Sequence, residues 1–133
     1  MLSPRFSLLL AWLLATLLPV PLLAQGQDNC AAAQPISGTG LFAFNNLFAL
    51  PDGLPDGLCD FAGSQQIFND VWFSWTAPAD GVATVSTCGL TTVDTKVAVY
   101  DGICLGTVLV CDDDSCGLQS EVSWPALAGK VYT

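Results

Sequence analysis

Residues 70–88 constrain the fold most strongly, because they read as two strands joined by a tight turn. Apolar side chains at every second position of residues 71–76 predict a strand with one buried face. Pro78 and Gly81 supply turn chemistry, since proline fixes φ and glycine can adopt a positive φ. Residues 82–87 form a second β-rich run. We therefore predict an antiparallel hairpin at the centre of an all-β domain.

The first 24 residues are interpreted as a signal peptide rather than as part of the fold. A short basic start that includes Arg5 precedes an apolar run over residues 6–18, and Pro19 and Pro21 follow the run. Ala24 is a small residue that suits the position before a cleavage site. An uncleaved membrane anchor is the alternative, but the run is short for spanning a bilayer. We expect one secreted domain over residues 25–133 that has no contact with the membrane after cleavage.

All six cysteines lie in residues 25–133. An even number of cysteines behind a signal peptide predicts disulfides. A zinc site is the weaker alternative, because the chain has no histidine and no Cys-x-x-Cys spacing. The order of the cysteines along the chain favours three pairs: Cys30 with Cys59, Cys88 with Cys116, and Cys104 with Cys111.

Further strands are predicted at residues 39–44, 95–100, 107–111, 121–124 and 130–133. The loop of residues 45–69 contains a repeated Pro-Asp-Gly-Leu turn, and we expect Cys59 to fasten it. The chain stops inside a predicted strand, so we expect a domain whose last strands are missing and whose sheet has an unpaired edge.

The strand patterns also predict which side chains form the core between two sheets. The predicted core is Phe73, Trp75, Val97, Val99, Val122 and Trp124. Trp72 and Tyr100 fall on the opposite face, where exposed aromatic rings suit a sugar or peptide surface. Coverage by a loop or isolated exposure is the more common situation for such rings.

Catalytic chemistry has little support in the residue types. Without histidine there is no Ser-His-Asp triad and no histidine-activated cysteine. A serine–lysine pair would need Lys96 or Lys130, and both lie in strand patterns. A carboxylate pair for glycoside hydrolysis needs a separation that a sequence does not show. We therefore expect no enzyme activity within these residues and no cofactor apart from calcium.

Calcium is the one ion that the acidic residues could bind. Asp112, Asp113 and Asp114 place three carboxylates in one turn, and Asp94 and Asp101 could approach from neighbouring strand ends. A plain solvated turn is the alternative, because consecutive aspartates point in different directions. Twelve acidic residues against two lysines after loss of the signal peptide also exclude nucleic acid as a partner.

The order of several loose motifs resembles the bacterial pre-peptidase C-terminal domain of secreted multidomain proteins. The motifs are DVWFSWTAPADG at residues 70–81, VATVSTCG at 82–89, DTKVAVYDG at 94–102, CDDD at 111–114 and VSWPALAGKVY at 122–132. The resemblance implies a jelly-roll-like antiparallel β-sandwich that is non-catalytic. Relatives in that family include modules that bind collagen or other insoluble substrates, often with calcium.

These observations predict a secreted accessory or adhesion module that stabilises or targets a larger extracellular protein. Its expected partners are the other domains of that protein or an extracellular polymer. The alternative is that residues 25–133 are the front part of a secreted peptidase or glycosidase whose catalytic domain lies beyond residue 133.

Overall fold

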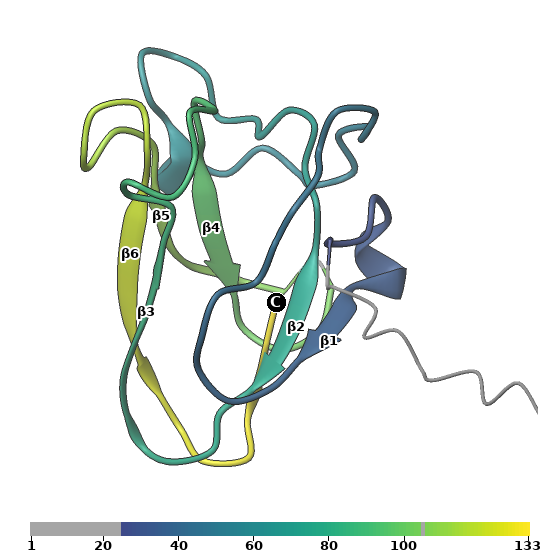
Figure 1. The fold of residues 1–133 in the computed structure, drawn as a ribbon, viewed down its shortest axis with the longest axis vertical. Coiled ribbons are helices and arrows are strands. Elements are labelled where there is room, and N and C mark those ends of the chain that lie inside the picture. The colour runs from purple at the N-terminus through teal and green to yellow at the C-terminus, as the bar shows by residue number, and fades with distance from the viewer. Residues whose placement is uncertain (1–24, 105) are drawn as a thin grey trace, which may run out of the picture.

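The computed structural model describes residues 25–104 and 106–133, and these residues form an all-β fold, as predicted. Seven short strands and two single-turn 3-10 helices follow one another along the chain (Figure 1). Their bounds are η1 Cys30–Ala32, β1 Gln34–Ile36, η2 Gly57–Cys59, β2 Phe73–Thr76, β3 Gly81–Ser86, β4 Val97–Tyr100, β5 Val108–Asp112, β6 Glu121–Ala126 and β7 Val131–Tyr132. The predicted signal peptide lies outside the described residues. None of the helices in residues 25–104 and 106–133 has the length and apolar character needed to cross a membrane.

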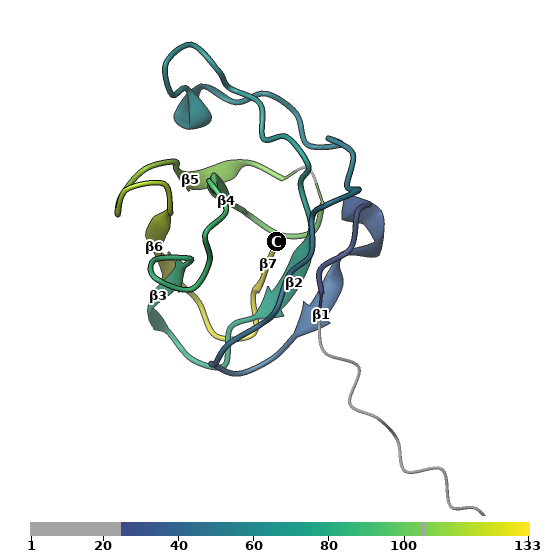
Figure 2. The same ribbon diagram turned by 45° about the horizontal axis from the view of Figure 1, so that its top comes forward.

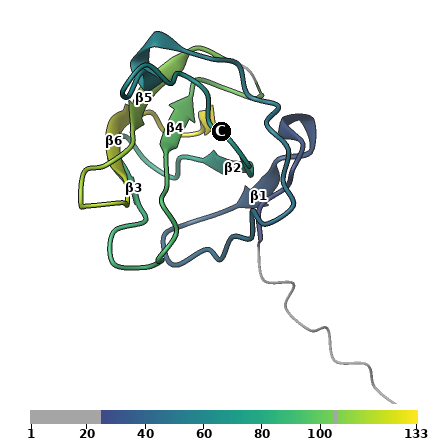
Figure 3. The ribbon, with the colours of Figure 1, turned by 90° about the horizontal axis from the view of Figure 1, so that it is seen from above.

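The strands form three small sheets around a shared interior (Figures 2 and 3). One sheet has the order β1-β2-β7, in which β2 is parallel to β1 and antiparallel to β7. The pairs β3-β6 and β4-β5 are both antiparallel. A bridge between Asp101 and Tyr132 joins the end of β4 to β7. The predicted antiparallel pairing therefore holds everywhere except between β1 and β2.

The predicted hairpin of residues 70–88 is wrong, although both of its strands exist. β2 and β3 lie in different sheets, because the chain between them continues to pair with the β7 side. Ala77 is buried, its N–H donates to the carbonyl of Lys130, and its own carbonyl accepts from the N–H of Gly129. The connection therefore crosses from one sheet to the other instead of reversing.

The predicted strand at residues 39–44 is also wrong, since these residues form no strand. The first strand is β1, in a segment that has no period-two pattern of apolar residues. The backbone of the neighbouring strand explains its formation, because the carbonyl of Trp72 accepts from the N–H of Gln34 and of Gln27. The strands predicted at residues 95–100 and 107–111 are confirmed as β4 and β5, which pair with each other as an antiparallel hairpin.

The first core lies between the sheets and contains most of the predicted residues. Its buried members are Ala77, Val99, Val122, Trp124, Ala126 and Tyr132. Trp75 and Val97 pack against this cluster while partly exposed, and Phe73 is half-buried outside it. The ring of Trp75 meets that of Trp124 edge to face with centroids 6.0 Å apart. Such aromatic contacts add to the stabilisation from burial alone.

A second core lies on the face where Trp72 and Tyr100 were candidates for exposure. Both rings are buried, 6% and 5% exposed, with centroids 5.2 Å apart. Val108 and the sulfurs of Cys30 and Cys59 complete the cluster. The two rings are therefore no surface for a ligand, because residues 45–69 and their disulfide cover them.

Three disulfides fasten the fold, and they correct two of the predicted pairs. The observed pairs are Cys30–Cys104, Cys59–Cys111 and Cys88–Cys116, of which the last is as predicted. Cys104 does not meet Cys111, because the cross-strand neighbour of Cys111 in β5 is Ala98 of β4. Cys59 instead attaches the long loop to β5, which confirms that this cysteine fastens the loop.

Candidate functional site

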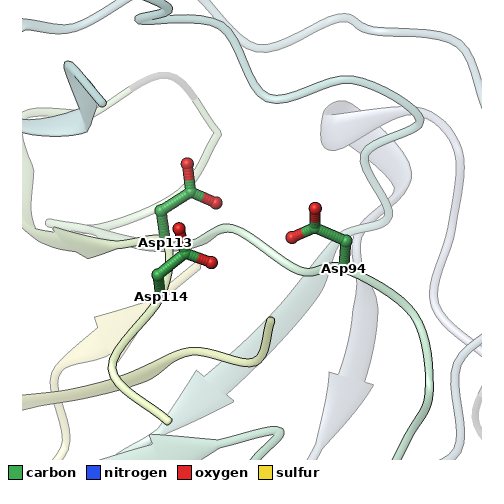
Figure 4. A group of neighbouring side chains, drawn as sticks. All are labelled: Asp94, Asp113 and Asp114. Carbon is green, nitrogen blue, oxygen red and sulfur yellow. The ribbon is translucent and has the colours of Figure 1, made fainter. Parts of the chain in front are cut away.

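Three of the five predicted calcium ligands come together at one end of the β4-β5 pair. The carboxylates of Asp94, Asp113 and Asp114 offer oxygens that lie within 4.8 Å of one another. Asp94 precedes β4 and the other two follow β5, so the antiparallel pairing brings them side by side. Figure 4 shows the three carboxylates turned toward one another.

Lys96 already supplies a positive charge to this acidic cluster, which we define as Asp94, Asp113 and Asp114. Its Nζ lies 3.2 Å from Oδ2 of Asp113, and its side chain is only 10% exposed. The same Nζ donates to the carbonyls of Cys59 and Ser64. A calcium ion needs six to eight oxygen ligands, so it would have to compete with Lys96 and take several waters.

The remaining two predicted ligands point elsewhere. Asp112 accepts hydrogen bonds through Oδ2 from the N–H groups of Ser115 and Glu121. Its burial alone would raise its pKa, but these hydrogen bonds outweigh burial and leave the pKa below its ordinary value. Asp101 forms an ion pair of 2.7 Å with Lys130, and the hydrogen bond to Asp101 raises the pKa of that lysine.

A second polar site, which the sequence did not indicate, fixes the long loop to the second core. Oδ2 of Asp52 accepts from the N–H of Cys30 at 2.8 Å, and Oδ1 accepts from Nε1 of Trp72 at 2.6 Å. Asp70 in turn accepts from the N–H groups of Asp52 and Gly53. Burial raises the pKa of Asp70 above its ordinary value despite these bonds.

Gly53 allows this close approach of loop and core. A Cβ at this position would lie 3.0 Å from Oδ2 of Asp70 and 3.2 Å from the ring of Trp72. Such distances are tighter than most Cβ contacts, so a larger residue would have to push Asp70 or Trp72 aside by a few tenths of an ångström. Glycine at this position therefore serves close packing and not a positive φ. The first Pro-Asp-Gly turn of the repeat therefore packs closely against Trp72 of the second core.

Because the polar groups of the loop face inward, its apolar side chains face solvent. We define residues 47–58 as the apolar loop. Its exposed large apolar side chains are Leu47, Phe48, Leu50, Leu54 and Leu58. Phe48 is 88% exposed and borders a shallow hollow that Asp28, Asn45 and Val71 also line. Sequence reasoning missed this surface, although the leucine that ends each turn repeat was a signal for it.

The two lysines that a serine–lysine pair would need both have acidic partners. Lys96 and Lys130 are both engaged in ion pairs, which leaves neither free to activate a serine there. The whole chain contains no histidine.

The comparisons with known proteins identify no relative: no family model, curated protein or solved structure matches the chain. The resemblance to the pre-peptidase C-terminal domain therefore stays a prediction carried by the quoted motifs.

Proposed function

We propose that this chain is a secreted, non-catalytic accessory module with a jelly-roll-like fold of the pre-peptidase C-terminal type. It attaches a larger extracellular protein to a partner surface, either another domain or an insoluble polymer. The apolar loop is the contact surface.

The observation that carries this proposal is the orientation of the apolar loop. Its carboxylates and glycine are used to hold the second core, while its leucines and Phe48 are left in solvent. Exposed apolar side chains gathered on one segment are typical of an interaction site, whereas single exposed apolar residues need no explanation. The disulfide of Cys59 with Cys111 reduces the entropy that such a loop would lose on binding.

The disulfides and the net charge support an extracellular location and restrict the kinds of partner. Three disulfides suit an oxidising, extracellular environment. Twelve acidic residues oppose only three basic ones over the whole chain, which disfavours nucleic acid and anionic lipid as partners.

Retention on insoluble polymers tests the proposal directly. We would measure binding of the oxidised protein to suspensions of collagen, chitin, cellulose and peptidoglycan, and would compare Phe48→Ser with the parent chain. Binding to at least one polymer, weakened several-fold by Phe48→Ser, is expected. Leu127→Ser is the matched control, because Leu127 is also exposed, at 56%, but lies in the turn between β6 and β7. Equal loss from both variants, or binding to none of the polymers, would count against this function.

A further inference from the structure

Strand β3 has a neighbour on one side only. It pairs with β6 over its whole length, from Gly81 opposite Ala126 to Ser86 opposite Glu121, and no other strand of the described residues joins its second edge. Val82 is 79% exposed and Val85 39%. β3 is therefore an edge strand that is open to solvent.

The pairing of Thr87, the residue after β3, shows which N–H and C=O groups of β3 point toward β6 and which point away from it. The N–H of Thr87 donates to the carbonyl of Ser120, which continues the register of β3 with β6. In an antiparallel pair, residues that bond to the partner alternate with residues that face away. The N–H and C=O groups of Val82, Thr84 and Ser86 therefore point to the free edge.

Two details of the β3-β6 pair agree with this assignment. Pro125 has no N–H to donate, and it lies opposite Val82, where no ladder bond is expected. The hydroxyls of Thr84 and Ser123 approach to 2.7 Å, as fits the closer spacing of a non-hydrogen-bonded pair. The free edge thus offers three unused donor and acceptor pairs at alternate residues.

This edge lacks the features with which proteins usually block strand addition. β3 contains no proline and no charged residue, and its pairing with β6 has no bulge. By contrast, β1 is short and contains Pro35. Strand β5 has a neighbour besides β4, because the disulfide Cys59–Cys111 ties the loop that carries η2 to it.

We propose that the free edge of β3 is a strand-addition site that binds an extended polypeptide segment of a partner protein. Only an extended backbone presents donors and acceptors with the spacing of Val82, Thr84 and Ser86. Ala83 packs against the first core, and Val85 lies on the same face of the strand. Side chains of the bound segment on that face would extend the first core, so we expect them to be apolar. Acidic side chains are disfavoured, since Asp80 and Glu121 flank the strand. This site is separate from the apolar loop and does not depend on it.

Selection from a display library of short random peptides tests the proposal on the oxidised protein. We expect enrichment of peptides in which apolar residues alternate with neutral or basic ones. Bound peptide should slow amide exchange of Val82, Thr84 and Ser86, the outward residues. Exchange at Ala83 and Val85 should stay unchanged, because their amides already bond to β6.

Two substitutions of Thr84 distinguish the contribution of its outward N–H group from that of its side chain. Thr84→Pro removes an outward N–H without removing a bond to β6, so it should weaken peptide binding about tenfold. Thr84→Val keeps the N–H, loses the hydroxyl contact with Ser123, and should bind as the parent does. If Thr84→Pro does not fold, the exchange pattern of the parent protein decides.

Three results would overturn the proposal. One is a selection that enriches no alternating peptide, and another is binding that leaves the outward amides unaffected. The third is protection of those amides that rises with protein concentration in the absence of peptide, because the occupant would then be a second copy of this chain.

Discussion

Nε1 of Trp72 donates a hydrogen bond of 2.6 Å to Oδ1 of Asp52 across the boundary between the second core and the long loop. Trp124, in the first core, is equally buried, but its Nε1 has no hydrogen-bond partner in the described structure. The two indoles therefore differ in polar contacts while they resemble each other in burial.

This difference predicts unequal costs for the same substitution. Trp72→Phe would leave Oδ1 of Asp52 without its donor in a partly buried site, whereas Trp124→Phe would remove an N–H that is unsatisfied. We expect Trp72→Phe to lower the free energy of unfolding by about 1–3 kcal/mol more than Trp124→Phe does. Denaturant unfolding of both variants, with disulfides intact, measures the difference.

The double variant Trp72→Phe with Asp52→Ala, compared with both single variants, is the control for this prediction. If the hydrogen bond is responsible, the two changes should be less than additive, because they share one interaction. Equal costs for the two tryptophans would mean that the bond contributes nothing to stability.

The disulfide of Cys59 with Cys111 is predicted to protect the apolar loop from proteolysis. Replacing both cysteines by alanine frees η2 from β5, so a protease should cleave within residues 47–58 much faster. The pair Cys88–Cys116 is the matched control, because it joins a different part of the chain. Its removal should destabilise the fold without exposing that segment, and mass spectrometry of the fragments distinguishes the two results.

Non-reducing peptide mapping of the parent protein accompanies this experiment. It should recover Cys59 linked to Cys111 and Cys30 linked to Cys104. Recovery of Cys104 linked to Cys111 would show that the loop is not held by β5.

Strand positions could be predicted where one face only is buried. In β6, Val122 and Trp124 are buried and their neighbours Glu121 and Ser123 are exposed, so the period-two pattern gave both the strand and its inner face. The same logic correctly placed Trp72 on the face opposite Trp75, but it did not predict that this face belongs to a second core. A pattern that assumes one buried face has no signal for the second.

Long-range partners were the part that the sequence could not provide. Six cysteines allow fifteen pairings, and the order along the chain favoured local ones. Asp70 looks like an ordinary polar residue at the start of a strand, yet its partners are the backbone amides of residues 52 and 53. For the acidic cluster, residue type was informative but orientation was not, since Asp112 turns away from its two neighbours.

Calcium is predicted to bind the acidic cluster only weakly. Three carboxylates are few for calcium, and Lys96 neutralises one of them, so we expect affinity in the millimolar range of extracellular modules. Binding to the folded state alone should raise the melting temperature as calcium increases. Thermal unfolding across a calcium titration measures this effect.

Asp114→Asn should abolish the calcium-dependent rise, because it removes a ligand without touching the ion pair of Lys96. Asp112→Asn is the control, since Asp112 bonds to backbone amides instead. No rise in the parent protein at millimolar calcium, or an equal rise in Asp114→Asn, would mean that the cluster is a solvated turn.

Two aspartates should make stability depend on pH in opposite directions. The pKa of Asp70 is raised above 3.8 by burial, so the folded state holds its proton more tightly than the unfolded state does. This contribution stabilises the fold at low pH and is lost as pH rises from about the unfolded pKa through the raised pKa.

The pKa of Asp112 is lowered, because hydrogen bonds from Ser115 and Glu121 outweigh the effect of burial. Its contribution is present above 3.8 and is lost as pH falls through the lowered value.

Unfolding free energies measured in steps of pH from strongly acidic to neutral would separate the two groups. Asp70→Asn should remove the decline in stability as pH rises above 3.8, because the amide cannot lose a proton. Asp112→Asn should instead remove part of the decline as pH falls below 3.8, since its hydrogen bonds no longer involve a charged acceptor. A profile for Asp70→Asn that runs parallel to that of the parent protein would show that Asp70 ionises in the fold as it does in water. In that case the bonds from Asp52 and Gly53 would fully offset the effect of burial on its pKa.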